Sequence, residues 1–323
     1  MVDIDKDNLP NIIDGNVPKN YELCKEGDIV FADASEDTNE VAKAVEYYNL
    51  NGKKVVCGLH TIHGRDNKNK TVVGYKGYAF SSMSFHHQIR RIAQGTKIYS
   101  INSKNFSECY VGIPSKDEQQ KIADLLRLID ERIATQNKII DKLQSLIKGI
   151  AQKIVHSNKT NVRLSECVEC SSSTLQESDV CEHGAYPVYG ANGIVGYLDN
   201  YNTEGEAVYI IKDGSGVGTV SYVKGKCSAT GTLNTLQAKE GYSLQYLYYL
   251  LKVFNFEPYK TGMAIPHIYF KDYGKAKVFC PSYTEQLQYA RLLSAIDNKL
   301  SIEQNILTEL SLQKQCLLRQ MFI

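Results

Sequence analysis

The sequence predicts an α+β fold in which two strand-rich domains are joined by two long antiparallel coiled-coil helices, as an internal repeat with a pseudo-twofold axis. Three observations lead to this prediction. Residues 114–155 reappear as residues 281–322, each copy carries apolar residues at heptad spacing, and each copy follows a segment rich in β-branched and aromatic runs. A chain of 323 residues is long enough for two separate cores.

The repeat is positional. The residues Pro114, Ser115, Glu118, Gln119, Ala123, Leu125, Leu126, Ile129 and Asp130 match Pro281, Ser282, Glu285, Gln286, Ala290, Leu292, Leu293, Ile296 and Asp297. The same shift also matches Gly95, Ile98 and Ile101 with Gly262, Ile265 and Ile268. A repeat of this length differs from the short period of a solenoid and indicates two related domains.

The first domain is predicted over residues 1–111. Runs of β-branched and aromatic residues predict strands at residues 28–33, 53–59 and 71–80. An amphipathic pattern predicts a helix around residues 82–94.

The first long helix is predicted over residues 112–156. Ser115 and Glu118 have the spacing of a capping box, and Pro114 keeps the helix from beginning earlier. Behind the cap, a seam with alternating spacings of three and four residues contains Leu126, Ile129, Ile133, Gln136, Ile140 and Leu143, and it continues to Ile154.

The second domain is predicted over residues 157–280, with strands at 207–212, 218–224 and 276–279 and a helix around 243–254. The second long helix is predicted over residues 281–323, with Ser282 and Glu285 as its capping box. Its seam contains Leu293, Ile296, Leu300, Glu303, Leu307 and Leu310, in the same frame as the first.

Each long helix would extend roughly 55 Å at about 1.5 Å per residue, which is more than its own domain needs. We therefore expect the two seams to pack against each other, antiparallel because a whole domain lies between them. Packing of each helix on its own domain is the alternative. Gln136 and Glu303 interrupt the two seams at the same place, where polar residues set the register at some cost in stability.

The net charge is +1, but basic residues are concentrated in one region of each repeat. Asp66 is the only acidic residue between Tyr47 and Ser107, where ten lysines and arginines occur. This distribution suits a polyanion such as nucleic acid, and it is also typical of a solvated lysine-rich surface.

Several enzymatic motifs are missing, namely the phosphate-binding GxxxxGK[ST] loop, the zinc hydrolase HExxH and the GxSxG elbow. Gly214, Gly216 and Gly218 have GxGxG spacing and precede a predicted strand, so a tight hairpin is favoured over a cofactor loop. The nine cysteines are scattered, which indicates reduced thiols. We expect no metal site, although Cys167, Cys170, Cys181 and His183 have spacing that is compatible with zinc.

A glycine-containing polar loop recurs at the same distance before each capping box, at residues 94–101 and 261–268. It is either a connecting loop or a binding loop that reaches phosphates and base edges. The candidate DNA-contacting residues in and near these loops are Arg90, Arg91, Lys97, Tyr99, Ser100, Lys212, Ser215 and His267.

On these features the chain resembles the specificity (S) subunit of type I restriction-modification systems. The resemblance covers most of the chain and rests on the Pro-Ser-x-x-Glu-Gln helix starts at residues 114–119 and 281–286, the preceding loops, and the stretch Tyr186–Tyr197. It implies two target recognition domains, each reading half of a bipartite site in double-stranded DNA. It also implies that the two helices fix the spacer and dock two methyltransferase (M) subunits, which restriction (R) subunits join. Catalysis, S-adenosylmethionine, ATP and Mg are then expected on the partners, with no cofactor on this chain.

The first domain departs from the family pattern. Only 26 residues precede Gly27, and none of them resembles residues 186–197, so we expect a first recognition domain that is incomplete at its N-terminus. The function expected is a non-enzymatic DNA-recognition subunit in the cytoplasm, since no apolar run is long enough for a membrane span. The alternatives are a coiled-coil scaffold, an S subunit that does not read DNA, and an enzyme that uses the GxGxG loop.

Overall fold

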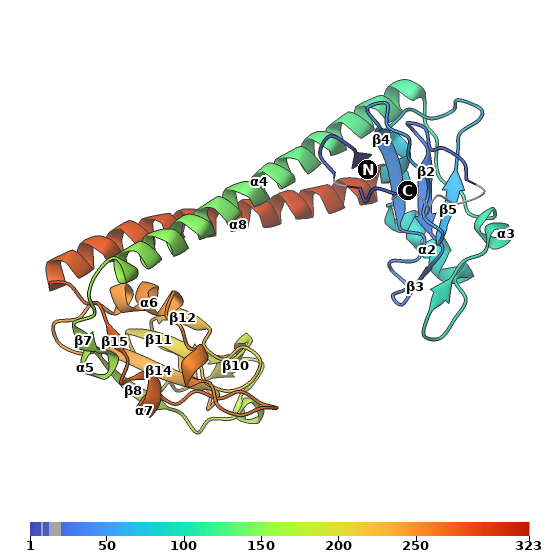
Figure 1. Ribbon diagram of the computed structural model, residues 1–323. Helices are drawn as coiled ribbons and strands as arrows, with labels where there is room; N and C mark the ends of the chain where they lie inside the picture. The colour runs from blue at the N-terminus through green and yellow to red at the C-terminus, as the bar shows by residue number, and fades with distance from the viewer. Residues whose placement is uncertain (8, 13–20, 323) are drawn as a thin grey trace. The chain divides into compact units, whose positions relative to one another are not determined.

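The computed structural model describes residues 1–7, 9–12 and 21–322. The chain forms two compact units, one of Met1–Lys138 with Gln304–Ile323 and one of Ile139–Glu303 (Figure 1). Each unit therefore contains a strand-rich segment together with part of both long helices. Strands and helices are mixed in both units, as an α+β fold requires.

In unit 1, a four-stranded sheet has the order β1-β4-β2-β5 (Figure 1). Strand β1 pairs parallel to β4, whereas β2 pairs antiparallel to both β4 and β5. A short antiparallel pair, β3 with β6, lies beyond the end of β2. The strands are β1 (Val2–Asp3), β2 (Ile29–Ala32), β3 (Ala34–Ser35), β4 (Ala44–Asn49), β5 (Thr61–Gly64) and β6 (Tyr99–Ser100).

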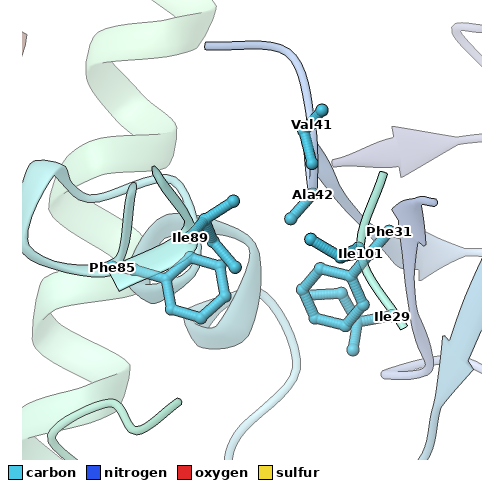
Figure 2. Close-up of a cluster of buried hydrophobic side chains, with 7 residues drawn as sticks. All are labelled: Ile29, Phe31, Val41, Ala42, Phe85, Ile89 and Ile101. Atoms are coloured by element: carbon cyan, nitrogen blue, oxygen red, sulfur yellow. The ribbon is translucent and has the colours of Figure 1, made fainter. Parts of the chain in front are cut away.

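Three short helices complete the strand-rich part of unit 1: α1 (Tyr75–Ala79), α2 (Met83–Ile92) and α3 (Ser103–Phe106). Phe85 and Ile89 of α2 project toward Phe31 and Ile101 and form a buried core with them (Figure 2). The ring centroids of Phe31 and Phe85 are 6.3 Å apart. The predicted helix around residues 82–94 is thus confirmed, because its apolar side covers the sheet.

Two strand predictions in unit 1 are wrong. Residues 53–59 form no strand, and only an isolated bridge joins Val56 to Leu23. The run predicted as a strand at residues 71–80 contains α1 instead. Its aromatic residues, Tyr75 and Tyr78, favour β structure locally but are buried against the first long helix, and this tertiary contact decides the conformation.

Unit 2 contains a four-stranded antiparallel sheet of order β12-β11-β14-β8 and a three-stranded sheet of order β10-β9-β13. Its strands are β7 (Val162–Arg163), β8 (Val168–Ser172), β9 (Tyr186–Gly190), β10 (Gly193–Leu198), β11 (Glu206–Ile211), β12 (Val220–Lys224), β13 (Ser228–Ala229), β14 (Leu233–Ala238) and β15 (Lys277–Val278). Its helices are α5 (Leu164–Cys167), α6 (Leu244–Lys252) and α7 (Phe270–Tyr273), with 3-10 turns at Glu177–Asp179 and Glu257–Tyr259. The strand predictions around β11, β12 and β15 and the helix prediction around α6 are confirmed.

The two long helices are α4 (Lys116–His156) and α8 (Tyr283–Met321). In unit 1 they run antiparallel, because Ala123 and Leu126 pack in one cluster with Met321 and Phe322, while Asp130 pairs with Lys314 further along. All ten apolar seam residues are buried or half-buried: Leu126, Ile129, Ile133, Ile140, Leu143, Leu293, Ile296, Leu300, Leu307 and Leu310. Gln136 and Glu303 are buried as well.

Both capping boxes form as predicted. Glu118 accepts hydrogen bonds from the backbone N–H (3.1 Å) and the hydroxyl (2.7 Å) of Ser115. Glu285 accepts the same two bonds from Ser282, at 3.1 and 2.6 Å. Among the described residues, no helix is both long enough and apolar enough to cross a membrane.

Candidate nucleic-acid interface

The repeated polar loops make the same backbone hydrogen bonds in both units. In unit 1, Gln94 and Ser100 exchange two backbone hydrogen bonds of 2.9 and 2.8 Å, and in unit 2 Thr261 and His267 do the same at 2.9 and 2.7 Å. Each loop is then attached to the residue that follows a central strand, since Ile101 N–H donates to the Asp33 carbonyl and Ile268 N–H donates to the Lys212 carbonyl, both at 2.9 Å. We call residues 94–100 and 261–267 the recognition hairpins.

Glycine is required inside each recognition hairpin. Gly95 and Gly262 have φ of +138° and +88°, and a Cβ on them would lie 1.9 Å from the Ile98 carbonyl oxygen and 2.3 Å from that of Ile265. These glycines therefore close the hairpin on itself. Ile98 and Ile265 are 60% and 58% exposed, so the tips project apolar side chains into solvent at matched positions.

In unit 2, three of the predicted residues lie on two loops that are bonded together. Lys212 and Ser215 belong to the β11–β12 loop, and His267 closes the neighbouring hairpin. Gly214 N–H donates to the Pro266 carbonyl at 3.0 Å, and His267 Nδ1 lies 2.6 Å from Asp213 Oδ1. The Asp213 carboxylate thus fixes the orientation of the imidazole, while Ser215 remains exposed.

The Lys212 ammonium is half-buried and donates to the Ser172 hydroxyl at 3.3 Å. Ser172 donates in turn to Asn234 Oδ1 at 3.1 Å. These are neutral partners, so the positive charge of Lys212 stays available to an anion.

In unit 1, the predicted residues occupy the recognition hairpin and the end of the preceding helix. Lys97 and Ser100 are exposed, whereas the Tyr99 ring packs against the core of the sheet. Arg90 and Arg91 lie in the last turn of α2, both exposed, and Arg90 donates to the side-chain oxygen of Asn39. Tyr99 therefore contributes to stability, and the cations beside it face solvent.

Two basic residues of the predicted cationic region form ion pairs with buried carboxylates instead of lying free on the surface. Arg65 donates to both carboxylate oxygens of Asp28 and pairs with Glu22, and Lys76 is 7% exposed with its Nζ 3.0 Å from Glu46 Oε1. Charge counting along the sequence overestimated the basic surface for this reason. Lys68, Lys70 and Lys104 are exposed, as the solvated-surface interpretation also requires.

The other candidate motifs are resolved by local contacts. The GxGxG run lies in the loop of residues 212–219 that connects the antiparallel strands β11 and β12, which is longer than a tight hairpin, and Gly218 N–H donates to the Ile211 carbonyl at 2.9 Å. The zinc-like set is dispersed, because the Cys167 sulfur lies 3.7 Å from Cys280 and Cys181 is exposed. Within the described ranges, only Cys24, Cys57 and His63 gather as a group of three potential metal ligands, and spacing along the chain gave no signal for them.

Sequence reasoning also missed the residues that attach each long helix to its unit. Gln119 Oε1 accepts from the Val72 N–H (3.0 Å) and its amide donates to the Pro114 carbonyl (2.8 Å). Gln286 repeats this with the Ser243 N–H and the Pro281 carbonyl, both at 2.9 Å. The glutamine of each Pro-Ser-x-x-Glu-Gln motif is thus a structural link between helix and domain.

Two tyrosine–aspartate pairs repeat as well. Tyr78 donates to Asp130 at 2.9 Å, and Tyr249 donates to Asp297 at 3.3 Å. Burial, and then the nearby carboxylate charge, raises the pKa of each tyrosine above its usual value, so the phenols stay protonated as donors. The counterpart of α6 in unit 1 is therefore α1 and not α2.

Comparison with known proteins identifies the family. The family model for the type I restriction modification DNA specificity domain matches twice, at residues 7–145 and 156–312. A putative type I specificity subunit of Mycoplasma genitalium is 25% identical over 269 residues, which cover 76% of this chain and 69% of that protein. The EcoprrI specificity subunit of Escherichia coli is 29% identical over 126 residues, but these span only 39% of this chain and 30% of that protein.

Solved structures share the fold. The crystal structure of a type I restriction-modification S subunit from M. genitalium superposes with a TM-score of 0.66 at 19% identity, covering 97% of this chain and 87% of that one. A chain from a solved type I restriction-modification system gives a TM-score of 0.57 at 15% identity, with coverages of 95% and 84%. With two family matches that together span most of its length, the chain belongs to the type I restriction-modification DNA specificity family.

Proposed function

We propose that this chain is the non-catalytic DNA-recognition subunit of a type I restriction-modification complex. In this proposal each unit reads one half of a bipartite site in double-stranded DNA through its recognition hairpin. The observation that carries the proposal is the duplication of that hairpin with the same hydrogen bonds and exposed tip. A pair of equivalent binding elements suits a site with two halves.

The charges near the hairpins support phosphate contacts. Lys97, Arg91 and Ser215 are exposed, and the Lys212 ammonium donates to the neutral Ser172 hydroxyl. Lysine and arginine bind phosphate oxygens and position a protein on the duplex, whereas base edges specify sequence. His267, oriented by Asp213, is the side chain best placed for a directional hydrogen bond.

The long helices are proposed to fix the spacer and to dock two M subunits. Although their seams are buried, both helices keep large apolar residues exposed, among them the matched pair Leu125 and Leu292, at 41% and 50% exposure. Repeated exposed apolar side chains favour a partner surface that is present in two copies. We propose that R subunits join this assembly and that S-adenosylmethionine, ATP and Mg act on the partners.

A coiled-coil scaffold without a DNA role is the second candidate. The exposed apolar residues of both helices favour it, but it leaves the recognition hairpins unexplained. The two functions differ in whether the assembled complex binds duplex DNA.

The test is to co-express the chain with the M subunit of its own locus, determine the mass of the complex, and measure duplex DNA binding at several salt concentrations. Lys97→Ala and Lys212→Ala are each expected to lower the slope of log K against log salt by about 1, the effect of losing one phosphate contact. Lys53→Ala and Lys226→Ala are matched controls, because strand register places them at the opposite ends of their sheets from the hairpins. An assembled complex that binds no DNA would favour the scaffold, and equal slopes for the controls and for Lys97→Ala and Lys212→Ala would contradict the proposed phosphate contacts.

A further inference from the structure

A cluster of two cysteines and one histidine lies in unit 1, away from the recognition hairpin. Cys24, Cys57 and His63 each place one potential ligand atom within 4.8 Å of the other two, and the two sulfurs are 3.2 Å apart. The described residues contain no other such group. Cys24 is buried, while Cys57 and His63 are half-buried, so the cluster is reachable from solvent on one side.

Three separate segments bring these side chains together. Cys24 N–H donates to the Val55 carbonyl at 2.9 Å, and Leu23 forms an antiparallel bridge with Val56. These contacts place Cys24 beside Cys57, although 33 residues separate them. His63 lies on β5, whose register with β2 is fixed by the sheet.

The hydrogen bond between His63 and the buried Asp28 is also of the kind found at metal sites. His63 Nε2 lies 2.9 Å from Asp28 Oδ2, and Asp28 is 2% exposed. Asp28 also accepts from Arg65 Nε at 2.9 Å and from the Lys25 N–H at 2.8 Å. A carboxylate on one ring nitrogen fixes the tautomer of a histidine and leaves its other nitrogen for a metal ion; in His63 this other nitrogen, Nδ1, also lies 3.7 Å from Oε2 of the exposed Glu22.

The distance between the Cys24 and Cys57 sulfurs distinguishes a disulfide from a pair of metal-binding thiolates. A disulfide requires about 2.05 Å between the sulfurs. Two thiolates on one tetrahedral zinc ion stand roughly 3.8 Å apart, given Zn–S bonds of about 2.3 Å. The observed separation of 3.2 Å lies between these two values and is closer to that of a zinc site.

We propose that Cys24, Cys57 and His63 bind one Zn²⁺ ion with the fourth position open to solvent. The set of two thiolates and one imidazole is typical of zinc, and hard cations such as Mg²⁺ prefer oxygen ligands. The ion would join the segment before β2, the turn after β4 and strand β5, and so stabilise unit 1. The proposal stands independently of the DNA-recognition function.

The test uses the full-length chain, purified under reducing conditions with a metal chelator and then titrated with Zn²⁺ or with Co²⁺ as a spectroscopic probe. We expect about one equivalent of zinc per chain, a thiolate-to-cobalt charge-transfer band, and a rise in the melting temperature with zinc. Cys57→Ser is expected to abolish all three, and Asp28→Asn to weaken binding on the order of 10–100-fold.

Cys316→Ser and Cys181→Ser are matched controls, since both cysteines are exposed and lie outside the cluster. They are expected to retain the zinc equivalent and the cobalt band. The proposal is overturned if the folded, reduced chain shows no cobalt–thiolate band, or if Cys181→Ser removes the band and Cys57→Ser does not. A Cys24–Cys57 disulfide that persists in the reductant and excludes the metal would overturn it equally.

Discussion

A buried ion pair between Lys76 and Glu46 joins α1 to the sheet of unit 1. Lys76 is 7% exposed and Glu46 is fully buried. The Lys76 Nζ lies 3.0 Å from Glu46 Oε1 and donates to the Thr71 hydroxyl at 3.0 Å, while Gly77 N–H donates to the other carboxylate oxygen at 2.7 Å. Each charge depends on the other, since a lone buried charge is costly.

Replacing Lys76 by methionine is expected to destabilise unit 1 by about 3–5 kcal/mol, because the Glu46 carboxylate then stays buried without its cation. The double variant Lys76→Met with Glu46→Gln should recover a part of the loss. Urea unfolding followed by circular dichroism measures the difference. Lys70→Met, at an exposed position nearby, is the control, and an equal loss there would contradict the assignment.

Asp66 gives unit 1 a pH-dependent contribution to stability. Burial acts to raise its pKa, but hydrogen bonds from the Thr71 hydroxyl and from the backbone amides of Thr71, Lys68 and Lys70 outweigh this and lower the pKa to about 2. A carboxyl group with a lowered folded pKa stabilises the fold above its unfolded pKa, and this contribution is lost as pH falls through the folded value.

We therefore expect Asp66→Asn to be less stable than the parent at pH 7, with a difference that shrinks between pH 4 and about pH 2. Chemical unfolding at a series of pH values measures it. A difference that stays constant down to pH 2 would show that the carboxylate charge is not responsible.

Single residues were predictable where their partners are local. The capping boxes follow from Ser115 and Glu118, three residues apart, and from their copies in the second helix. The Asp213–His267 pair was not predictable, since 54 residues separate its members and neither has a distinctive neighbourhood in the sequence.

At the scale of elements, the recognition hairpins depend on their glycines. Gly95→Ala and Gly262→Ala would each place a Cβ against a carbonyl oxygen at positive φ, so we expect a cost of about 1–3 kcal/mol and faster amide exchange at Ser100 or His267. Hydrogen exchange followed by mass spectrometry or NMR tests this. Gly112→Ala is the control, since a Cβ there meets nothing within 4 Å; unchanged protection in the hairpin variants would refute the requirement.

Gln119 and Gln286 are expected to hold α4 and α8 onto their units. Gln119→Leu and Gln286→Leu each remove the side-chain partner of a backbone N–H and of a carbonyl that are half-buried or buried, at about 1–3 kcal/mol for each group left unpaired. Gln120→Leu is the control, because Gln120 is exposed and its side-chain amide bonds Asp124 on the same helix. Thermal unfolding of the three variants decides the matter, and equal melting temperatures would count against the glutamine links.

The elements themselves were predictable where periodicity is long and clear. The two helices of 41 and 39 residues and their seams follow from heptad spacing. The sequence predicts a strand where α1 forms, because these residues favour β structure and the helix depends on Asp130 and the glutamine link. The glutamine link joins residues that are 47 positions apart in unit 1 and 43 positions apart in unit 2. A single fixed shift between the two repeats therefore does not align α1 with α6.

At the scale of the whole molecule, the internal repeat extends from sequence to hydrogen bonds. Among the described residues, both units repeat the recognition hairpin, the Ser–Glu capping box of the long helix, the glutamine link and the tyrosine–aspartate pair. The described part of unit 1 contains no strand pair corresponding to β9 and β10, and the segment before Gly27 that we expected to be short lies partly outside the described residues. Because the two recognition hairpins have different surroundings, we predict that the two DNA half-sites differ in sequence.

The most direct test of the central claim is DNA selection from a random duplex library by the complex with its M subunit, for the parent chain and for variants in one hairpin at a time. We expect the parent to enrich two defined halves at a fixed spacing. His267→Ala should relax only one half, with the other half and the spacing unchanged, whereas Arg91→Ala with Lys97→Ala removes phosphate contacts and should weaken binding without changing the motif. The account is contradicted if no bipartite motif is enriched, or if variants in one hairpin relax both halves alike.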